Sequence, residues 1–389
     1  MLSVNPSLSE EDLQYLKTYK YKAGSYTALD TLLSDLAQQT VRFVPEWLSP
    51  NAITLIGFAL NLCGVAALEL LTNEDGSPTR AALFLCALTA AVYIYMDMLD
   101  GKQARRLGCS SPLGQIFDHG CDSMSMSCFT YSIVRAIGLK DYRLAGVMFA
   151  VVGFVFVTFQ LIEYYQDVLM FGTSVCGVSE VEVSCVVVLL LSSFFGTSLW
   201  STSLFGFTLR DCVVFFVVVL MGGAIFGKSV LILFQGGKTV EEDGNKNNSR
   251  LDHVKRYVPL LTICLLTAYV SFTPLMRDYP HVVIVIVALC FSHYSILVNV
   301  CHLCKKSLSC NFQGHAVLII LALCAWVRAP VPLFGMLLLC CAELAIYSVF
   351  IRNVLLAVSR ALHIRVFAVK FSSDWSVCLA VMSFIDDKQ

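Results

Sequence analysis

The chain is a succession of long apolar segments separated by short polar ones. Most of the apolar segments approach the roughly 20 residues that a helix needs to cross a hydrocarbon core of about 30 Å. Ten such predicted spans cover residues 51–71, 80–98, 114–138, 144–163, 181–200, 211–233, 257–274, 281–301, 315–329 and 331–353. The pattern predicts an all-α, polytopic integral membrane protein with about ten transmembrane helices.

Composition supports this class. Hydrophobic residues make up 57% of the chain and charged residues 14%, with a mean hydropathy of +0.73, whereas soluble domains carry about 25% charged residues. The net charge of −1 gives no basic surface for nucleic acid. Most of the 17 cysteines stand singly inside predicted spans, where a thiol behaves as a small apolar group, so we expect free thiols. The segment Cys301-His302-Leu303-Cys304 lacks a second ligand pair, and we interpret it as the end of a span.

The residues before the first span are polar and lack the apolar core of a signal peptide. Within them, apolar residues recur at helical spacing with polar residues on the other side. The apolar positions are Leu29, Leu32, Leu33, Leu36 and Val44. This stripe predicts an N-terminal interfacial amphipathic helix that lies on the bilayer surface.

The distribution of Lys and Arg predicts the orientation, because positive residues concentrate on the cytosolic side of a membrane. With a cytosolic N-terminus, the opposite side receives only Arg80, Arg135, Lys140, Arg143, Arg210, Arg277 and Arg328. Nearly all other Lys and Arg then fall on the cytosolic side. We therefore expect both termini, and the polar motif described next, to face the cytosol.

One stretch of ionisable residues interrupts the apolar pattern. Residues 97–122 read DMLDGKQARRLGCSSPLGQIFDHGCD. Asp97, Asp100, Gly101, Ala104 and Arg105 share one face of a helix, and Gly114, Asp118 and Asp122 share one face of the next, with Pro112 suited to its first turn. Two short helical faces then bring four carboxylates together at the ends of two spans.

Four carboxylates cannot all stay ionised at close quarters without a counter-charge. Oxygen ligands suit magnesium, calcium or manganese, and two metal ions about 4 Å apart would favour a phosphoryl displacement. Arg105 would then contact a phosphate. The alternative is a salt-bridge network of the aspartates with Lys102, Arg105 and Arg106, but it leaves the small residues Gly101, Ala104 and Gly114 unexplained.

The pattern D-x2-D-G-x2-A-R-x8-G-x3-D-x3-D resembles the signature of the CDP-alcohol phosphatidyltransferase family, and it is matched here without a gap. The flanking DGKQARR and SSPLGQIFDHGCDS, the upstream stretch 48–54 and the C-terminal HIRVFAVK resemble the eukaryotic choline and ethanolamine phosphotransferases. The resemblance is dense over 41–123 and thin over the last six spans.

The resemblance implies a magnesium-dependent transfer of phosphocholine or phosphoethanolamine from CDP-choline or CDP-ethanolamine to the 3-hydroxyl of diacylglycerol, with release of CMP. Two Mg²⁺ ions are implied, with Mn²⁺ as an alternative. The residues implied are Asp97, Asp100, Asp118 and Asp122 for the metals, Asn51, Gly101, Ala104, Arg105 and Gly114 for the CDP-alcohol, and His119 as the base. The family also implies a homodimer in the endoplasmic reticulum membrane, with the Golgi as the alternative.

Three further features stay open from the sequence. Glu180 matches a glutamate that pairs with the histidine in this branch, but Glu182 is a rival and a solvated loop acid is the simpler interpretation. Tyr164 and Tyr165 could hold a choline ammonium by cation–π attraction, although tyrosines are common at membrane interfaces. Ser373-Asp374-Trp375 is similar to ethanolamine-type members, whereas DHGCDS favours choline or dual types, so the head group is undecided.

The loop 236–256 separates six spans that carry the motif from four that carry no comparable cluster. We expect an N-terminal segment 1–48, a catalytic domain 49–235, a linker 236–256, a four-span bundle 257–355 and a cytosolic tail 356–389. Two other functions remain possible on the residues alone. One is a family member that uses CDP-diacylglycerol with an acceptor such as inositol or serine. The other is a divalent-cation transporter, which would instead place acidic residues near the membrane midplane in repeated halves.

Overall fold

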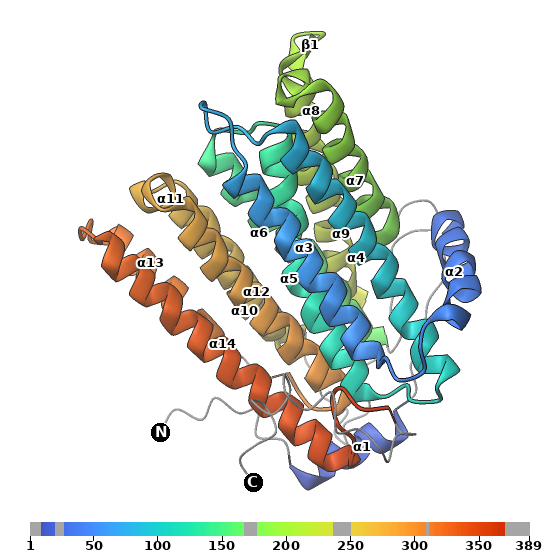
Figure 1. Ribbon diagram of the computed structural model, residues 1–389. Coiled ribbons are helices and arrows are strands. Elements are labelled where there is room, and N and C mark those ends of the chain that lie inside the picture. Colours follow the sequence, from blue (N-terminus) through green and yellow to red (C-terminus); the bar gives the residue numbers. More distant parts are fainter. Residues whose placement is uncertain (1–8, 20–26, 167–176, 236–249, 309–310, 370–389) are drawn as a thin grey trace.

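The computed structural model describes residues 9–19, 27–166, 177–235, 250–308 and 311–369. Most of the predicted linker and Ser373-Asp374-Trp375 lie outside these residues. The long helices run side by side in one bundle (Figure 1). Its first part contains α1 (Glu10–Thr18), α2 (Ala28–Thr40), α3 (Pro50–Leu70), α4 (Arg80–Arg106), α5 (Pro112–Ala136), α6 (Tyr142–Gln166) and α7 (Val178–Phe195).

The second part begins with a two-stranded hairpin and is otherwise helical. Its elements are β1 (Ser203–Leu204), β2 (Phe207–Thr208), α8 (Leu209–Phe215), α9 (Gly222–Gln235), α10 (Arg250–Ser271), α11 (Pro274–Asp278), α12 (Pro280–Leu303), α13 (Ala316–Trp326) and α14 (Leu333–Leu362). A π-helical segment, Phe216–Met221, joins α8 to α9.

Within the described residues, eight helical segments are long and apolar enough to cross a membrane: α3, α4, α6, α7, Leu209–Ser229, Val254–Ser271 of α10, α12 and α14. The two other predicted spans are also helices. α5 is long enough at 25 residues, but the polar motif lowers its hydropathy. α13 has only 11 residues, fewer than the ~20 of a full crossing. The prediction of an all-α polytopic membrane protein is confirmed.

Polar caps explain why several helices begin where they do. The side chains of Ser49, Thr79 and Ser111 each accept the backbone N–H of the residue three positions on, at 3.2 Å. Each cap satisfies a donor that the first turn of a helix leaves unpaired. Pro50 and Pro112 follow two of these caps at the first helical position, where the missing N–H costs nothing.

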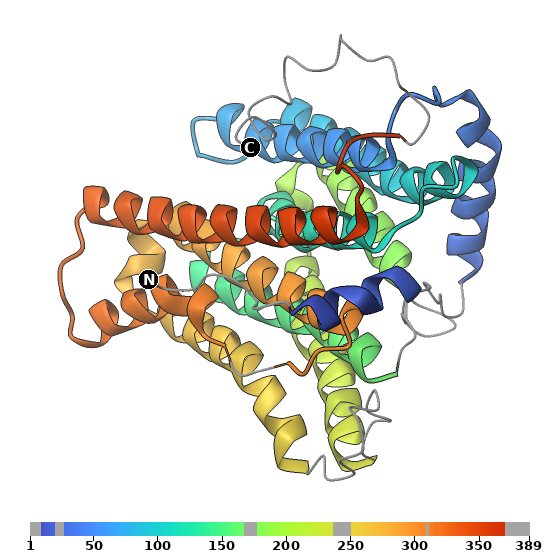
Figure 2. The same cartoon turned by 90° about the horizontal axis from the view of Figure 1, so that it is seen from below.

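The helices that follow residue 250 pack into the earlier ones. α10 lies along α6, and α12 contacts α5, α6 and α14. α12 is the most enclosed helix, with every residue from 286 to 303 buried, and Figure 2 shows it inside the bundle. Gly153 of α6 allows this close approach, because a Cβ there would lie 2.6 Å from the ring of Phe291. The division of the chain at residues 236–256 stays a prediction.

The N-terminal helices lie outside the bundle. α2 contains the predicted stripe from Leu29 to Leu36 but ends at Thr40, before Val44, and it packs on α4 and α7. Leu32 and Leu36 are exposed on its outer side, as a helix at a bilayer surface requires. α1 is fastened near the end of α12, since Lys306 donates to Asp12 at 2.8 Å. Burial acts to raise the pKa of Asp12, but hydrogen bonds from Lys306 and Ser9 outweigh it and keep that pKa below its usual value.

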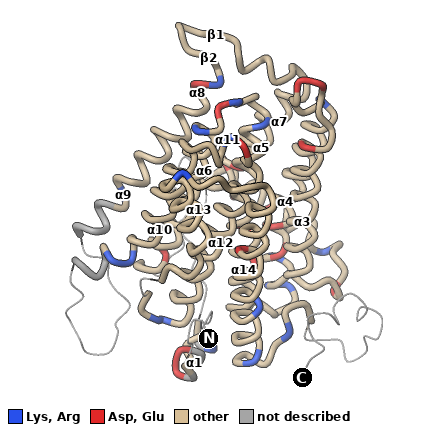
Figure 3. The backbone as a smooth tube through the Cα atoms, turned by 90° about the vertical axis from the view of Figure 1, so that its left-hand side faces the viewer, with Lys and Arg blue, Asp and Glu red and all other residues tan. Residues whose placement is uncertain are grey.

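Charged residues gather towards the two ends of the bundle, and some acidic ones lie within its lower half (Figure 3). The described cysteines are free thiols, as predicted. The segment Cys301-His302-Leu303-Cys304 is the end of α12, with Cys304 as its C-cap, which confirms that interpretation.

Candidate active site

The motif forms the end of α4, a tight turn and the start of α5. α4 ends in a Schellman turn: the N–H of Gly108 donates to Arg105 O at 3.2 Å, and that of Cys109 to Ala104 O at 2.9 Å. Gly108 adopts φ +62°, a conformation that glycine takes without strain. Ser111 then caps α5, so the chain reverses within a few residues and sets the two polar faces side by side.

Three of the four aspartates come together at this end of the bundle. One carboxylate oxygen each from Asp97, Asp100 and Asp118 lies within 4.8 Å of the others. Within the described part of the chain, one oxygen of Asp97 and one of Asp118 are buried without a hydrogen-bond partner. Buried carboxylate oxygens without partners are costly unless a cation neutralises them. The oxygen-only donor set and these unpaired atoms therefore fit a hard divalent cation.

The neighbouring side chains hold individual oxygens of this group. Thr54 of α3 donates to Asp100 Oδ2. Tyr93 donates to Asp122 at 2.7 Å, and Asp122 lies beside Asp97. α3, α4 and α5 thus all contribute to the carboxylate cluster, with Asp122 at its edge.

The residues expected to contact the nucleotide surround the same end of α4 and α5. A Cβ on Gly101 would meet the guanidinium of Arg105 at 3.5 Å, and one on Gly114 would meet Asn51 Oδ1 at 3.6 Å. Asn51 donates through Nδ2 to the backbone carbonyl of Val366 at 2.6 Å. The segment after α14 therefore reaches this site from the far end of the sequence, and Phe367 packs edge-on against Phe117 at 5.4 Å.

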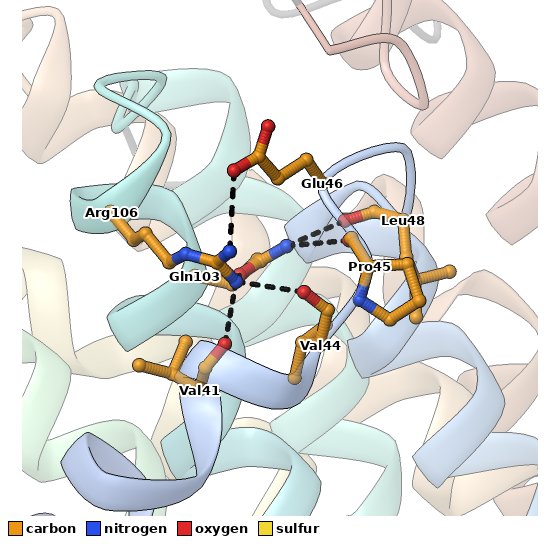
Figure 4. A network of polar contacts seen from close by, with 7 residues as sticks. All are labelled: Val41, Val44, Pro45, Glu46, Leu48, Gln103 and Arg106. Atoms are coloured by element: carbon orange, nitrogen blue, oxygen red, sulfur yellow. Dashed lines mark hydrogen bonds and ion pairs between the residues drawn. The ribbon is translucent and has the colours of Figure 1, made fainter.

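The basic cluster of the motif divides into two roles, which the sequence alone did not separate. Arg106 donates to the carbonyls of Val41 and Val44 at 2.6 and 2.7 Å, and lies 3.3 Å from Glu46 (Figure 4). Gln103 donates to the carbonyls of Pro45 and Leu48 at 3.0 and 3.2 Å.

Lys102 donates to Ser34 of α2 at 2.6 Å. These contacts fasten the motif to the segment that leads into α3. Arg105 forms no such bond among the described residues and folds over Gly101 towards the aspartates.

His119 lies one residue after Asp118 and is buried, with 7% of its surface exposed. It faces His302 of α12 closely enough for the two rings to interact electrostatically. His302 Nε2 lies 3.7 Å from Glu163 Oε1 of α6, and Gln115 donates to the same oxygen at 3.3 Å. The sequence alone connects neither Glu163 nor His302 with the site.

The two candidate glutamates of α7 differ in their surroundings. Glu180 accepts the backbone N–H of Gly177 at 2.8 Å and closes the first turn of α7. Glu182 is close enough to Asp97 and Asp122 to interact with them electrostatically. The structure therefore brings Glu182, rather than Glu180, towards the carboxylate cluster.

The tyrosine pair of α6 already faces a cation. Arg256 of α10 lies over Tyr164 at 5.5 Å and over Tyr165 at 5.8 Å from the ring centroids. Tyr164 also donates to Lys306 O at 3.1 Å. The ring faces that this guanidinium covers are not open to a substrate ammonium, so the pair joins α6 to α10.

Comparison with known proteins agrees with this geometry. The family model described as CDP-alcohol phosphatidyltransferase matches residues 47–292, which include the motif, Asn51 and both glutamates. "Cholinephosphotransferase 1" of Xenopus laevis is 34% identical over 256 residues, which are 59% of this chain and 62% of that protein. "Cholinephosphotransferase 1" of Homo sapiens is 30% identical over 319 residues, which are 79% of this chain and 76% of that protein.

An "Uncharacterized CDP-alcohol phosphatidyltransferase class-I family protein 2" of Dictyostelium discoideum is 25% identical over 385 residues, 94% of this chain and 89% of that protein. The match to the Xenopus protein thus spans less than two thirds of its length, whereas the Dictyostelium match covers nearly the whole of both chains. Together with the carboxylate cluster on α4 and α5, these matches show that the chain belongs to the CDP-alcohol phosphatidyltransferase family.

Proposed function

We propose that this protein transfers phosphocholine or phosphoethanolamine from the CDP-alcohol to the 3-hydroxyl of diacylglycerol, which gives phosphatidylcholine or phosphatidylethanolamine and CMP. The observation that carries the proposal is the grouping of Asp97, Asp100 and Asp118 within 4.8 Å, next to the buried His119. A hard cation site beside a histidine is the pairing that a phosphoryl transfer to a hydroxyl needs.

In this proposal Asp97, Asp100, Asp118 and Asp122 hold Mg²⁺, two ions per site, or Mn²⁺ in its place. When bound, such ions neutralise the phosphate oxygens and the charge that develops on the departing CMP. Arg105 contacts a phosphate through its guanidinium, for which its geometry is suited. Gly101, Ala104 and Gly114 leave room for the nucleotide, and Asn51 contacts it.

The reaction exchanges one bond to phosphorus for another. The hydroxyl oxygen of diacylglycerol attacks the phosphorus that bears the choline or ethanolamine, and the bond from that phosphorus to the bridging oxygen breaks. CMP leaves with this oxygen. The hydroxyl proton passes to a nitrogen of His119, and a neutral imidazole is the side chain best suited to take it near neutral pH.

The glutamates of α7 have separate roles here. Glu182 lies near the carboxylates and adds to the negative charge that a bound cation would neutralise. Glu180, in the first turn of α7, orders the start of that helix, and a role of either glutamate at His119 stays a prediction.

The choice of head group rests on the relatives, whose names are those of cholinephosphotransferases. CDP-choline is therefore the first donor to test and CDP-ethanolamine the second. A family member that uses CDP-diacylglycerol is the closest alternative. The transporter alternative is not favoured, because in the described residues the three grouped carboxylates lie at one end of the bundle and not at its middle.

The decisive experiment is an assay of the purified protein with diacylglycerol, Mg²⁺ and both CDP-alcohols in competition. We expect transfer with CMP release, and its loss by at least 1,000-fold in Asp118→Ala, since removing metal-held charge stabilisation costs on the order of several kcal/mol. Asp278→Ala, an exposed aspartate in α11, is the matched control and should retain activity. Transfer by Asp118→Ala at the wild-type rate would refute the metal assignment. Product formation only with CDP-diacylglycerol would refute the donor.

A further inference from the structure

Three helices meet around His119, and the second half of one of them, α12, lies beyond the family match. α5 and α12 touch where Ser123 Oγ lies 2.5 Å from Ser292 Oγ, and where a Cβ on Gly120 would lie 3.3 Å from Ile296. α5 and α6 are joined by Gln115 and Glu163, and α6 and α12 by Glu163 and His302. Residue numbers fall along α12 as those of the contacting residues rise along α5, so these two helices are antiparallel. By the same contacts, α5 is antiparallel to α6.

These contacts define a polar layer of Gln115, Glu163 and His302, one residue from each helix. We call it the upper layer because it is the nearer of two such layers to the motif end of the bundle. One helical turn further into the bundle, each helix carries a second polar residue on the same face. On α5 it is His119, four residues after Gln115. On α6 and α12, which run the other way, they are Gln160 and Asn299, each three residues before its upper partner. His119, Gln160 and Asn299 therefore form a lower polar layer.

The lower layer differs from the upper one in its hydrogen bonding. Gln160 and Asn299 are buried, with 5% and 2% of their surface exposed. Among the described residues, His119 Nδ1, Gln160 Oε1 and both amide atoms of Asn299 have no hydrogen-bond partner. Burying an amide without partners inside a membrane protein costs stability. Three unpaired amide atoms at one level, together with the unpaired Nδ1 of the proposed base, indicate a polar ligand.

The chemistry of the layer restricts that ligand. His119 follows Asp118 directly on α5, so the lower layer lies at the level of the carboxylates, and two turns further into the bundle Gly153 and Phe291 bring α6 and α12 into direct contact. The unpaired atoms of the layer include both hydrogen-bond donors and acceptors, which suits a small polar group that carries both. A nucleotide phosphate would need positive charge, and the lower layer carries only amides and an imidazole.

We propose that Asn299 and Gln160 bind the glycerol ester group of the lipid acceptor, an inference that rests on the proposed transfer to diacylglycerol. The amide N–H of Asn299 donates to an ester carbonyl, and the amide oxygen of Gln160 accepts from the attacking hydroxyl before His119 takes its proton. The acceptor site is thus completed by α12 beyond residue 292, where the family match ends.

The test compares Asn299→Leu and Gln160→Met, which replace each amide by an apolar side chain of similar size. We expect the KM for diacylglycerol to rise about tenfold, which corresponds to one hydrogen bond, while the KM for the CDP-alcohol changes less than twofold. In the absence of substrate, both variants should melt at a higher temperature than the wild type, because an unpaired amide has been removed. A residue with a structural role would lower the melting temperature instead.

Asn61→Leu is the matched control. Asn61 of α3 is also buried, with 1% exposed, and its Nδ2 lacks a partner among the described residues, but it lies on none of the three helices. We expect its KM for diacylglycerol to equal that of the wild type. A second comparison uses dialkylglycerol, which keeps the hydroxyl but has no ester carbonyls. The wild type should prefer diacylglycerol about tenfold, and Asn299→Leu should lose this preference.

Equal rises in both KM values, or an unchanged preference for diacylglycerol in Asn299→Leu, would overturn the inference. If one variant does not fold, the other decides, because it changes the same layer from a different helix. A wild-type protein that transfers to no lipid acceptor would overturn the proposed function instead. In that case the melting temperature on adding diacylglycerol decides about the binding site. A rise in the wild type but in neither variant would still support the site, and no rise in the wild type would refute it.

Discussion

Neighbouring residues of the motif face different surroundings, because successive side chains on a helix point about 100° apart. Asp100 and Arg105 face the carboxylate cluster, whereas Gln103 and Arg106 face the segment 41–48 and are held by its carbonyls. One short polar stretch therefore contains both residues of the candidate site and residues that hold this stretch against the segment 41–48.

Arg105 and Arg106 provide a matched pair for testing this division. Arg105→Gln should raise the KM for the CDP-alcohol roughly tenfold to a hundredfold, since a hydrogen bond to a charged group contributes about 1.5–3 kcal/mol. Arg106→Gln should leave that KM near the wild-type value but lower the melting temperature, because two carbonyls and Glu46 lose their partner. Steady-state kinetics and thermal denaturation of both variants check this. A rise in KM for Arg106→Gln alone would reverse the two roles.

At the scale of elements, the turn between α4 and α5 determines how the two acidic faces meet. Its form depends on Gly108, whose φ of +62° ends α4, and on the Ser111 cap that starts α5. No atom lies within 4 Å of a Cβ built on Gly108. A substitution there therefore tests backbone conformation without a clash.

Gly108→Ala should destabilise the protein by about 1–2 kcal/mol, the cost of a left-handed conformation for a residue with a Cβ. Gly76, at the opposite end of the bundle, has φ +76° and equally open surroundings, so Gly76→Ala should cost about as much. We expect the folded fraction of Gly108→Ala to have several-fold lower activity, because the positions of Asp100 and Asp118 depend on this turn. Gly76→Ala should retain full specific activity. Equal activity of the two variants per folded molecule would show that the turn tolerates the change.

Local signals explain which elements the sequence could predict. The cap-and-proline pairs Ser49-Pro50 and Ser111-Pro112 mark the starts of α3 and α5, and helical spacing alone places Asp97 with Asp100 and Asp118 with Asp122. The partners of Gln103 were not predictable, because they are backbone carbonyls more than 50 residues away, brought near by packing. The same holds for His302, which meets His119 only because α12 inserts beside α5 and α6.

At the scale of the whole molecule, the site depends on segments from both ends of the sequence. Asn51 near the start of α3 is hydrogen-bonded to Val366 after α14, and α12 packs beside His119. A chain that ended after the sixth span would keep the carboxylates but lose both contacts. α12 and the segment after α14 therefore form part of the candidate active site in this structure.

The orientation of the bundle in the membrane is a property of the whole molecule, and insertions at its two ends test it directly. The turn at Gly108 lies at the motif end, and the β1–β2 hairpin lies at the other end (Figure 1), where Phe205 is 96% exposed. The excess of Lys and Arg at the motif end predicts that it faces the cytosol. A long polar loop carrying a glycosylation acceptor should therefore be glycosylated when inserted at residues 205–206, and should stay unmodified when inserted at Gly108. Gel mobility before and after glycosidase treatment of the microsomal protein reads out both. Glycan on the Gly108 insertion would place the carboxylates on the lumenal side and would refute the predicted orientation.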